Sequence, residues 1–174
     1  GFASGRYEGE PILMVGPSSG NGRAISEIAK QAFESVGFKV KLRLLSMEVV
    51  MTRFCGYPKA AVAVCPNVGW VKDFADGQTY LDPTFNGNNI QPVGNSNMSM
   101  LDDPAVNAAM ERAKTLTDPA ERARAWGEVD RKLTELAPAV PLVWDKVPMA
   151  HSKDVNAVPN EQLGIWDFAF TSLT

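Results

Sequence analysis

The stretch that decides the fold is residues 12–44, ILMVGPSSGNGRAISEIAKQAFESVGFKVKLRL. It begins with a short apolar run at 12–15, which is typical of a buried strand. After a glycine-rich loop, apolar residues recur at helical spacing from about 23 to 36, and Gly37 stands where a helix C-terminus favours glycine. Residues 38–44 then alternate apolar and basic side chains, as a half-buried strand does. This order predicts two parallel strands joined by a right-handed crossover.

Two more short elements are predicted before the chain becomes irregular. A helix is expected at about 47–54, with Ser46 as its N-cap. The apolar run at 60–64 is predicted as a buried strand, and Pro66 cannot continue its hydrogen-bond ladder. Residues 75–100 are rich in Gly, Asn, Asp and Pro and carry few periodic apolar positions, so we expect a long irregular stretch there.

The C-terminal part of the chain, from residue 103, is predicted to begin with two helices. Asp103-Pro104 and Asp118-Pro119 each open a helix, because Asp caps a helix N-terminus and Pro is tolerated at the first helical position. Strands are then predicted at 140–144 and 166–170. Together with the first unit, these elements predict an α/β fold in which helices flank a mixed sheet.

A candidate ligand site follows the predicted third strand, in residues 65–76, CPNVGWVKDFAD. The Trp70 indole offers a flat apolar wall, and the Asp73 carboxylate can pair with a ligand cation. Each has a structural alternative, since Trp70 can pack in the core beneath the irregular stretch and Asp73 can cap the following turn. The amides around Asn95 can likewise face a ligand or form a polar turn. The predicted ligand-binding residues are Trp70, Asp73, Gly69, Phe74, Asn67 and Asn95.

The two cysteines, Cys55 and Cys65, fall at the ends of a predicted helix and a predicted strand. The turn at 56–59 can bring those ends together. We therefore predict a disulfide, with two free thiols as the alternative. A metal site is disfavoured, because two cysteines and the distant His151 cannot supply four ligands.

The chain carries few signs of an enzyme. It has one histidine, His151, whereas a nucleophilic enzyme needs a base close to its nucleophile, and this disfavours a nucleophilic hydrolase. The glycine-rich loop at 16–22 does not match a phosphate-binding pattern. A carboxylate pair of Asp73 and Asp76 for glycoside hydrolysis is a weaker alternative. We expect a binding protein that makes and breaks no bond and uses no cofactor.

Composition and charge argue against nucleic-acid-binding and membrane-spanning proteins. The chain has 174 residues and a net charge of −3, which argues against nucleic acid as the main partner. Hydrophobic residues make up 45% and charged residues 21%, as in an ordinary folded domain. No apolar run approaches the roughly 20 residues needed to span a bilayer. The N-terminus has neither a Met nor a signal-peptide pattern, so we expect this chain to be a piece of a longer protein.

Four motifs carry a family resemblance. Residues 69–76, GWVKDFAD, match G-W-x-x-D-[YF]-x-D-P up to its last position, and residues 102–107, DDPAVN, match a helix start. Residues 118–126 match D-P-x-x-R-x-x-x-[YW], and residues 137–142 match A-P-x-[IV]-P-L. The chain resembles, over nearly its whole length, the C-terminal part of family 5 extracellular solute-binding proteins. These are the receptors of ABC importers for peptides, nickel and related solutes.

This resemblance implies a fold and a site. The fold is that of a C-terminal lobe of the periplasmic-binding-protein type (type II, cluster C), isolated from the rest of the receptor. In known peptide receptors the signature Asp pairs with the amino terminus of the ligand, which assigns that role to Asp73, with Trp70 beside it. Two departures concern the loop. Gly77 stands where the family has Pro, and a second Asp-Pro occurs at 82–83.

The resemblance also implies a longer, two-lobed parent. Residues 1–147 would form its C-terminal ligand-binding lobe, and residues 148–174 would return to the missing N-terminal lobe. The implied function is capture of a small solute, above all an oligopeptide, and its delivery to an ABC permease outside the cytoplasmic membrane, with the parent lipid-anchored. One lobe without the other is expected to bind ligand weakly or not at all. The alternative is a non-transport envelope lipoprotein or regulatory binding module that retains this fold.

Overall fold

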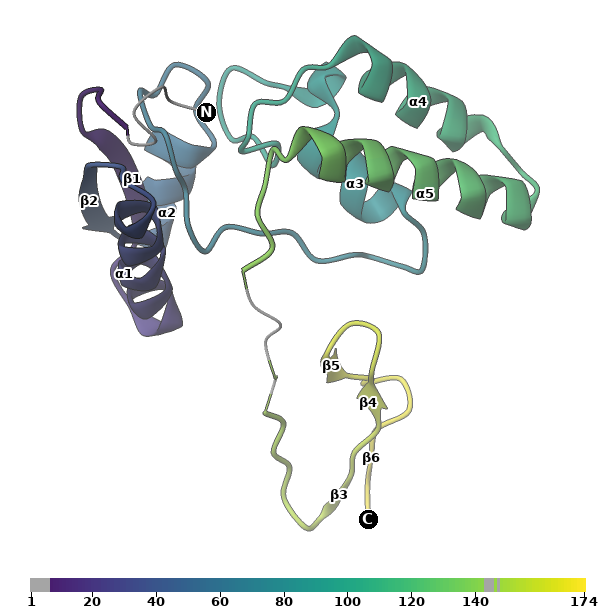
Figure 1. Cartoon of the computed structure of the whole chain (residues 1–174). Helices are drawn as coiled ribbons and strands as arrows, with labels where there is room; N and C mark the ends of the chain where they lie inside the picture. The colour runs from purple at the N-terminus through teal and green to yellow at the C-terminus, as the bar shows by residue number, and fades with distance from the viewer. Residues whose placement is uncertain (1–6, 143–145, 147) are drawn as a thin grey trace.

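The computed structural model describes residues 7–142, 146 and 148–174. Its first unit is β1 (Ile12–Pro17), α1 (Gly20–Ser35) and β2 (Val40–Leu45). The two strands pair in parallel, from Ile12 opposite Val40 to Pro17 opposite Leu45, and α1 packs against both (Figure 1). The predicted strand–helix–strand unit is therefore confirmed.

The contact between α1 and β1 depends on a glycine. Ser26 is buried on the inner face of α1, and its hydroxyl donates a hydrogen bond to the Gly22 carbonyl oxygen at 2.7 Å. A Cβ added to Gly16 in β1 would lie only 2.0 Å from the Ser26 Oγ. Gly16 thus lets helix and strand approach each other at this point.

The predicted third strand is wrong in its extent. Residues 60–64 pair with the free edge of β1 only at their end, where Val64 forms a single parallel bridge with Met14 and the Ala63 amide donates to the Leu13 carbonyl oxygen at 2.9 Å. Hydrogen-bond pairing between this segment and β1 is limited at both ends of the segment. The Ala60 amide already donates to the Tyr57 carbonyl oxygen in the preceding turn, and Pro66 has no amide hydrogen to donate.

The predicted helix at 47–54 is present, but most of it is a π-helix. One turn of α-helix, α2 (Met47–Val49), continues as a π-helix, η1 (Val50–Cys55). Ser46 caps it as predicted, because its hydroxyl oxygen accepts a hydrogen bond from the Val49 amide at 3.4 Å.

The prediction of an irregular stretch at 75–100 is wrong in part. A helix, α3 (Gln78–Phe85), lies within it, followed by one turn of 3₁₀-helix, η2 (Gly87–Asn89). The Asp76 carboxylate starts α3 by accepting from the Gln78 amide at 2.8 Å. This helix was not predicted from the sequence because Pro83 lies inside it, and a proline in the interior of a helix normally ends that helix.

The two helices predicted after residue 103 are confirmed as α4 (Pro104–Thr115) and α5 (Pro119–Leu136). Asp103 accepts hydrogen bonds from two amides of the first turn of α4, and Asp118 accepts one from Glu121 at the start of α5. The two helices lie side by side and enclose the larger hydrophobic core together with α3 (Figure 1). The buried residues of this core are Leu81, Val106, Ala109, Met110, Ala113, Trp126, Val129 and Leu133.

The segment after α5 contains little regular structure. Residues 140–142 of the predicted strand are irregular, and residues 143–145 lie outside the described part of the chain. Beyond them, β3 (Val155–Asn156) pairs antiparallel with β6 (Ser172–Leu173), and β4 (Pro159–Asn160) with β5 (Ile165–Trp166). The predicted strand at 166–170 is wrong after its first residue, because the amides of residues 170 and 171 turn back to the carbonyl oxygen of Asp167.

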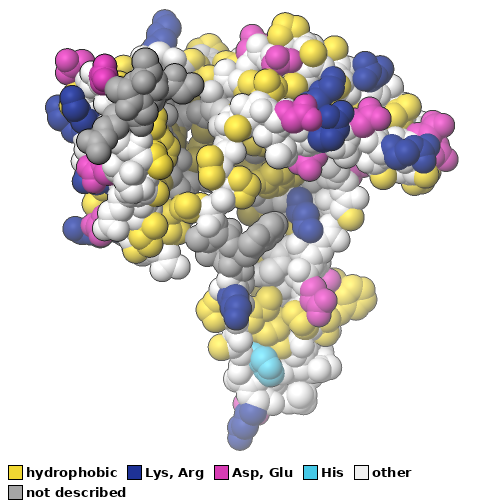
Figure 2. All heavy atoms as spheres, in the orientation of Figure 1, with side chains coloured by type: hydrophobic (Ala, Val, Ile, Leu, Met, Phe, Trp, Pro, Cys, Tyr) yellow, Lys and Arg dark blue, Asp and Glu magenta, His cyan; other side chains and the backbone are white. Residues whose placement is uncertain are grey.

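The chain has the predicted α/β class, but its described strands form three two-stranded sheets and not one mixed sheet. The C-terminal pairs project away from the helices (Figure 1) and carry many exposed hydrophobic side chains (Figure 2). Among these are Ile165, Phe168, Phe170 and Leu173. Within the described ranges, no helix has the length and apolar character required to cross a membrane.

Candidate functional site

The signature loop, residues 65–76, leaves the first unit at a covalent anchor. Cys55 at the end of η1 and Cys65 at the start of the loop form a disulfide, with their Cα atoms 6.0 Å apart. Cys55 is buried beside Val15 and Val50 in the smaller core. The start of the loop is thereby tied to the end of a packed helix.

Trp70 combines the two roles that the sequence left open. Its indole Nε1 donates a hydrogen bond to the Thr79 carbonyl oxygen on α3 at 3.0 Å. The side chain is nevertheless 38% exposed, so part of the ring faces solvent. Trp70 is therefore anchored on one edge and available for contact over the remainder of its surface.

The residues around Trp70 form the exposed part of the loop. Gly69 is exposed, with no heavy atom within 4 Å of where a Cβ would lie. Phe74 is 58% exposed, although its carbonyl oxygen accepts from the Thr79 hydroxyl at 3.1 Å. The Asp73 carboxylate is exposed and makes no hydrogen bond or ion pair with any residue of the described ranges. An apolar surface and an uncompensated carboxylate thus lie together on this loop.

The two asparagines of the predicted set lie away from this exposed part: Asn67 at the start of the same loop and Asn95 outside the loop. Asn67 is half-buried in the left-handed region, with φ of 57°, next to the packed start of α1. Asn95 is buried, and its amide nitrogen donates to the carbonyl oxygens of Gly56 and Gln91 while its oxygen accepts from the Gln91 amide. The hydrogen-bonding capacity of Asn95 is therefore used within the fold, which favours the alternative of a polar turn.

Arg122 on α5 forms a clamp on the loop that the sequence reasoning missed. Its Nε and Nη2 bind both carboxylate oxygens of Asp76, at 2.5 and 3.1 Å, and Nη2 also binds the Gln78 side chain. Its Nη1 donates to three backbone carbonyls at the end of α4, those of Ala113, Lys114 and Leu116. Both residues could be singled out from the sequence, because Asp76 and Arg122 are fixed positions of the quoted motifs. Their pairing could not be predicted, because they lie 46 positions apart in the chain.

The contact between Arg122 and Asp76 shifts the pKa of both groups. The hydrogen bond from Arg122 holds the pKa of the Asp76 carboxyl below its usual range, and the same bond raises the pKa of the Arg122 guanidinium. Asp76 is thus held as a charged carboxylate in a charge-assisted pair with Arg122.

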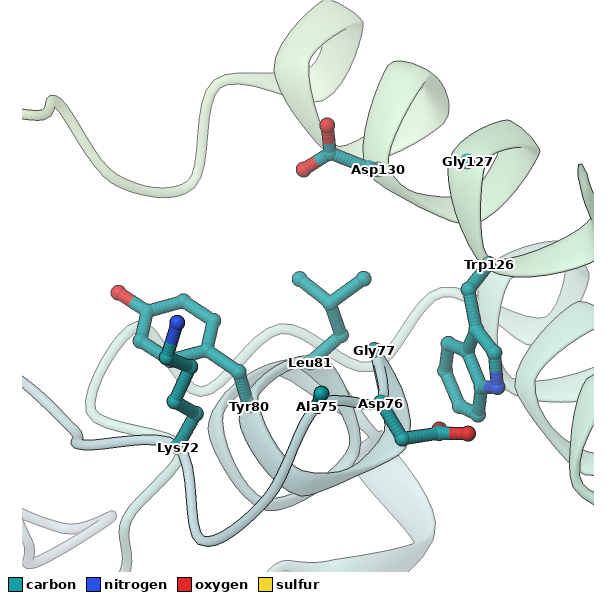
Figure 3. A pocket seen from close by; sticks show the side chains of 9 residues that line it. All are labelled: Lys72, Ala75, Asp76, Gly77, Tyr80, Leu81, Trp126, Gly127 and Asp130. Carbon is teal, nitrogen blue, oxygen red and sulfur yellow. The ribbon is translucent and has the colours of Figure 1, made fainter. Parts of the chain in front are cut away.

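An open pocket of about 460 Å³ lies between α3, α5 and the loop (Figure 3). Lys72 and Tyr80 stand on one side of it and Asp130 projects from α5 on the other, while the Asp76 carboxylate points away toward Trp126. Its lining residues are Lys72, Ala75, Asp76, Gly77, Tyr80, Leu81, Trp126, Gly127 and Asp130. A pocket with an apolar floor and one charge of each sign at its rim suits a small polar organic ligand.

The site offers apolar contacts and charge from the described residues. His151 is exposed, lies 2.9 Å from the Ser152 carbonyl oxygen through its Nδ1 and makes an edge contact with the Trp166 ring. Across the described part of the chain, no group of three or more His, Cys, Asp or Glu side chains could hold a metal ion. Among the predicted residues, the structure brings Gly69, Trp70, Asp73 and Phe74 together on one loop and separates Asn95 from them.

Comparison with known proteins gives a consistent set of relatives. No protein-family model matches the chain. Di/tripeptide-binding protein 4 of Pseudomonas aeruginosa (strain UCBPP-PA14) is 24% identical over 157 residues, which are 90% of this chain and 28% of that protein. The solved structure of clavulanic acid biosynthesis oligopeptide binding protein 2 matches with a TM-score of 0.84 and 26% identity, over 95% of this chain and 31% of that one.

A second structure shows the same fold at lower identity. The ABC transporter-associated periplasmic binding protein DppA from Helicobacter pylori, in complex with the peptide STSA, matches with a TM-score of 0.62 and 21% identity. It is covered over 24% of its length by 76% of this chain. The chain thus spans less than a third of each relative described. By sequence and by fold, its relatives are peptide-binding solute-binding proteins of the family 5 type, and the chain matches a part of them.

Proposed function

We propose that this chain is one lobe of an extracytoplasmic solute-binding protein whose full-length form captures short peptides and delivers them to an ABC importer. The names of the relatives support binding and no catalysis, since one is a di/tripeptide-binding protein and another an oligopeptide binding protein. In this proposal residues 1–147 are the ligand-binding lobe, and residues 148–174 return to the N-terminal lobe of the same parent. The parent lies outside the cytoplasmic membrane and is lipid-anchored.

The observation that carries the proposal is the exposed loop surface of Gly69, Trp70, Asp73 and Phe74. Asp73 has no partner among the described residues, so its charge is available to a ligand cation. The amino terminus of a peptide is such a cation, and the partly exposed Trp70 ring offers an apolar wall beside it. An isolated lobe presents these groups to water on one side, which is why we expect tight binding only from the two-lobed parent.

The second function considered from the sequence, an envelope lipoprotein or regulatory module without transport, gains no support from the relatives. Those reported above are named for binding peptides or for association with an ABC transporter. Peptide capture for import is therefore the function that we propose.

The test is native mass spectrometry of the full-length parent with a pool of di- to pentapeptides. We expect a peptide adduct on the unmodified parent and its loss in Asp73→Ala. Asp154→Ala is the matched control, because Asp154 is also exposed and its side chain makes no hydrogen bond or ion pair within the described ranges, but it lies on the C-terminal segment. No adduct on a folded parent would contradict peptide capture, and equal adducts in all three proteins would contradict the role of Asp73.

A further inference from the structure

Helix α3 contains a carbonyl group without a helical hydrogen-bond donor. Pro83 lies in the interior of this helix and has no amide hydrogen. In an α-helix the amide of residue 83 would donate to the carbonyl oxygen of residue 79. The Thr79 carbonyl therefore needs a donor from elsewhere, since Thr79 is only 6% exposed and a buried carbonyl without a donor is unfavourable.

The Trp70 indole supplies that donor. Its Nε1 lies 3.0 Å from the Thr79 carbonyl oxygen, the acceptor that Pro83 leaves open. Thr79 holds the loop a second time through its side chain, because the hydroxyl lies 3.1 Å from the carbonyl oxygens of both Phe74 and Asp76. The two ends of the loop surface thus meet at one buried residue of α3.

We propose that Thr79 and Pro83 are positioning residues, which hold the Trp70 indole on α3 and so keep its exposed ring in place for a ligand. Pro83 acts by leaving the acceptor open, and Thr79 acts by providing it. The consequence for binding rests on the proposed function, whereas the hydrogen bond itself does not. A ring that is fixed before the ligand arrives loses less rotational freedom on binding than a free one.

Pro83→Ala tests this arrangement. The substitution restores an amide that competes with the Trp70 indole for the Thr79 carbonyl oxygen. In ¹H–¹⁵N spectra of the 174-residue chain, the Trp70 indole signal is assigned by its loss in Trp70→Phe. We expect solvent exchange of this indole proton to become roughly 2- to 10-fold faster in Pro83→Ala, as the loss of one neutral hydrogen bond implies.

Pro104→Ala is the matched control. Pro104 is the first residue of α4, so no carbonyl within that helix depends on its missing amide. We expect the Trp70 indole exchange to remain as in the unmodified chain. The buried Trp126 indole, which has no hydrogen-bond partner among the described residues, is the internal reference that should not respond to Pro83→Ala. Unchanged Trp70 exchange in Pro83→Ala, or an equal change in Pro104→Ala, would overturn the proposal.

A double-mutant cycle gives an independent test that does not depend on exchange. In Trp70→Phe the Thr79 carbonyl has no donor, so Pro83→Ala supplies a bond that was missing. We expect Pro83→Ala to raise the unfolding midpoint in urea more in the Trp70→Phe chain than in the unmodified chain. Equal shifts in the two backgrounds would show that the two residues do not share this acceptor.

The effect on binding is measured in the full-length parent with trialanine as the probe. We expect the Kd to rise roughly 2- to 10-fold in Pro83→Ala and to stay unchanged in Pro104→Ala. A faster Trp70 exchange with an unchanged Kd would overturn the positioning role. If the unmodified parent does not bind trialanine, the proposed function fails for this peptide, and the exchange and cycle results still decide whether Pro83 holds the indole.

Discussion

Replacing Arg122 by Ala should destabilise the chain more than any comparable surface substitution, because Arg122 joins α5, the end of α4 and the signature loop. Its side chain is 19% exposed and that of Asp76 is 17%, so most of the pair is covered by protein. Without Arg122, the Asp76 carboxylate loses its countercharge and three carbonyls at the end of α4 lose a donor. The remaining groups are too covered to be fully solvated in its place.

The magnitude follows from this degree of burial. Exposed ion pairs contribute about 0–1 kcal/mol, whereas removing one partner of a fully buried pair costs about 3–5 kcal/mol. The Arg122–Asp76 pair lies between these limits, so we expect a loss of about 2–3 kcal/mol in the free energy of unfolding. For a chain of this size, that corresponds to a fall in Tm of about 4–12 °C. Helix propensity cannot account for the loss, because Ala is at least as favourable in a helix as Arg.

The assay is urea unfolding followed by circular dichroism, with Arg131→Ala as the matched control. Arg131 lies on the same helix and pairs with Glu135, but these side chains are 65% and 62% exposed. We expect its replacement to change the stability by less than about 0.5 kcal/mol. Arg122→Lys keeps the charge but not the planar fork, and should recover only part of the loss. Equal stabilities of Arg122→Ala and Arg131→Ala would refute the reasoning.

Two further predictions follow from the same structure. The pKa of Asp76 is lowered in the folded state by the hydrogen bond from Arg122, so the contribution of Asp76 to stability is complete above about pH 5 and is lost as the pH falls below about 4 toward the folded pKa. Urea unfolding from pH 3 to 7 should therefore show a stability difference between the unmodified chain and Asp76→Asn that shrinks on acidification. A constant difference would contradict this account. Replacing both Cys55 and Cys65 by Ser opens a short covalent loop and should lower the free energy of unfolding by about 2–3 kcal/mol, which urea unfolding without reductant measures; no change relative to the oxidised chain would show that the disulfide adds nothing to stability.

Much of the fold could be predicted because its signals are local. The alternation in 38–44, the helical spacing in 23–36 and the Asp-Pro pairs at 103–104 and 118–119 each specify an element through neighbouring residues alone. The structure confirms these elements within a few residues. The family resemblance, which rested on the order of four motifs, is confirmed by the relatives.

The errors concern elements whose partners lie far away in the sequence. The run at 60–64 has the composition of a strand, but whether it forms a ladder depended on the turn at Tyr57 and on how much of it reaches β1. Helix α3 forms although Pro83 disfavours it, because its apolar residues Leu81 and Phe85 pack against the core of α4 and α5. Tertiary packing here outweighs a local preference.

In the candidate site, too, local features could be predicted from the sequence and long-range contacts could not. The sequence by itself determined which loop carries the exposed aromatic and acidic side chains, because a Gly-Trp pair and a carboxylate after an apolar run form a local pattern. Only the tertiary structure decided what each residue does there. Trp70 is held by a carbonyl that Pro83 leaves open, Asp76 is bound by Arg122, and Asp73 keeps its charge available because no described side chain reaches it. Hydrogen bonds and ion pairs depend on distances between atoms, and folding alone brings together residues that the chain keeps 46 positions apart.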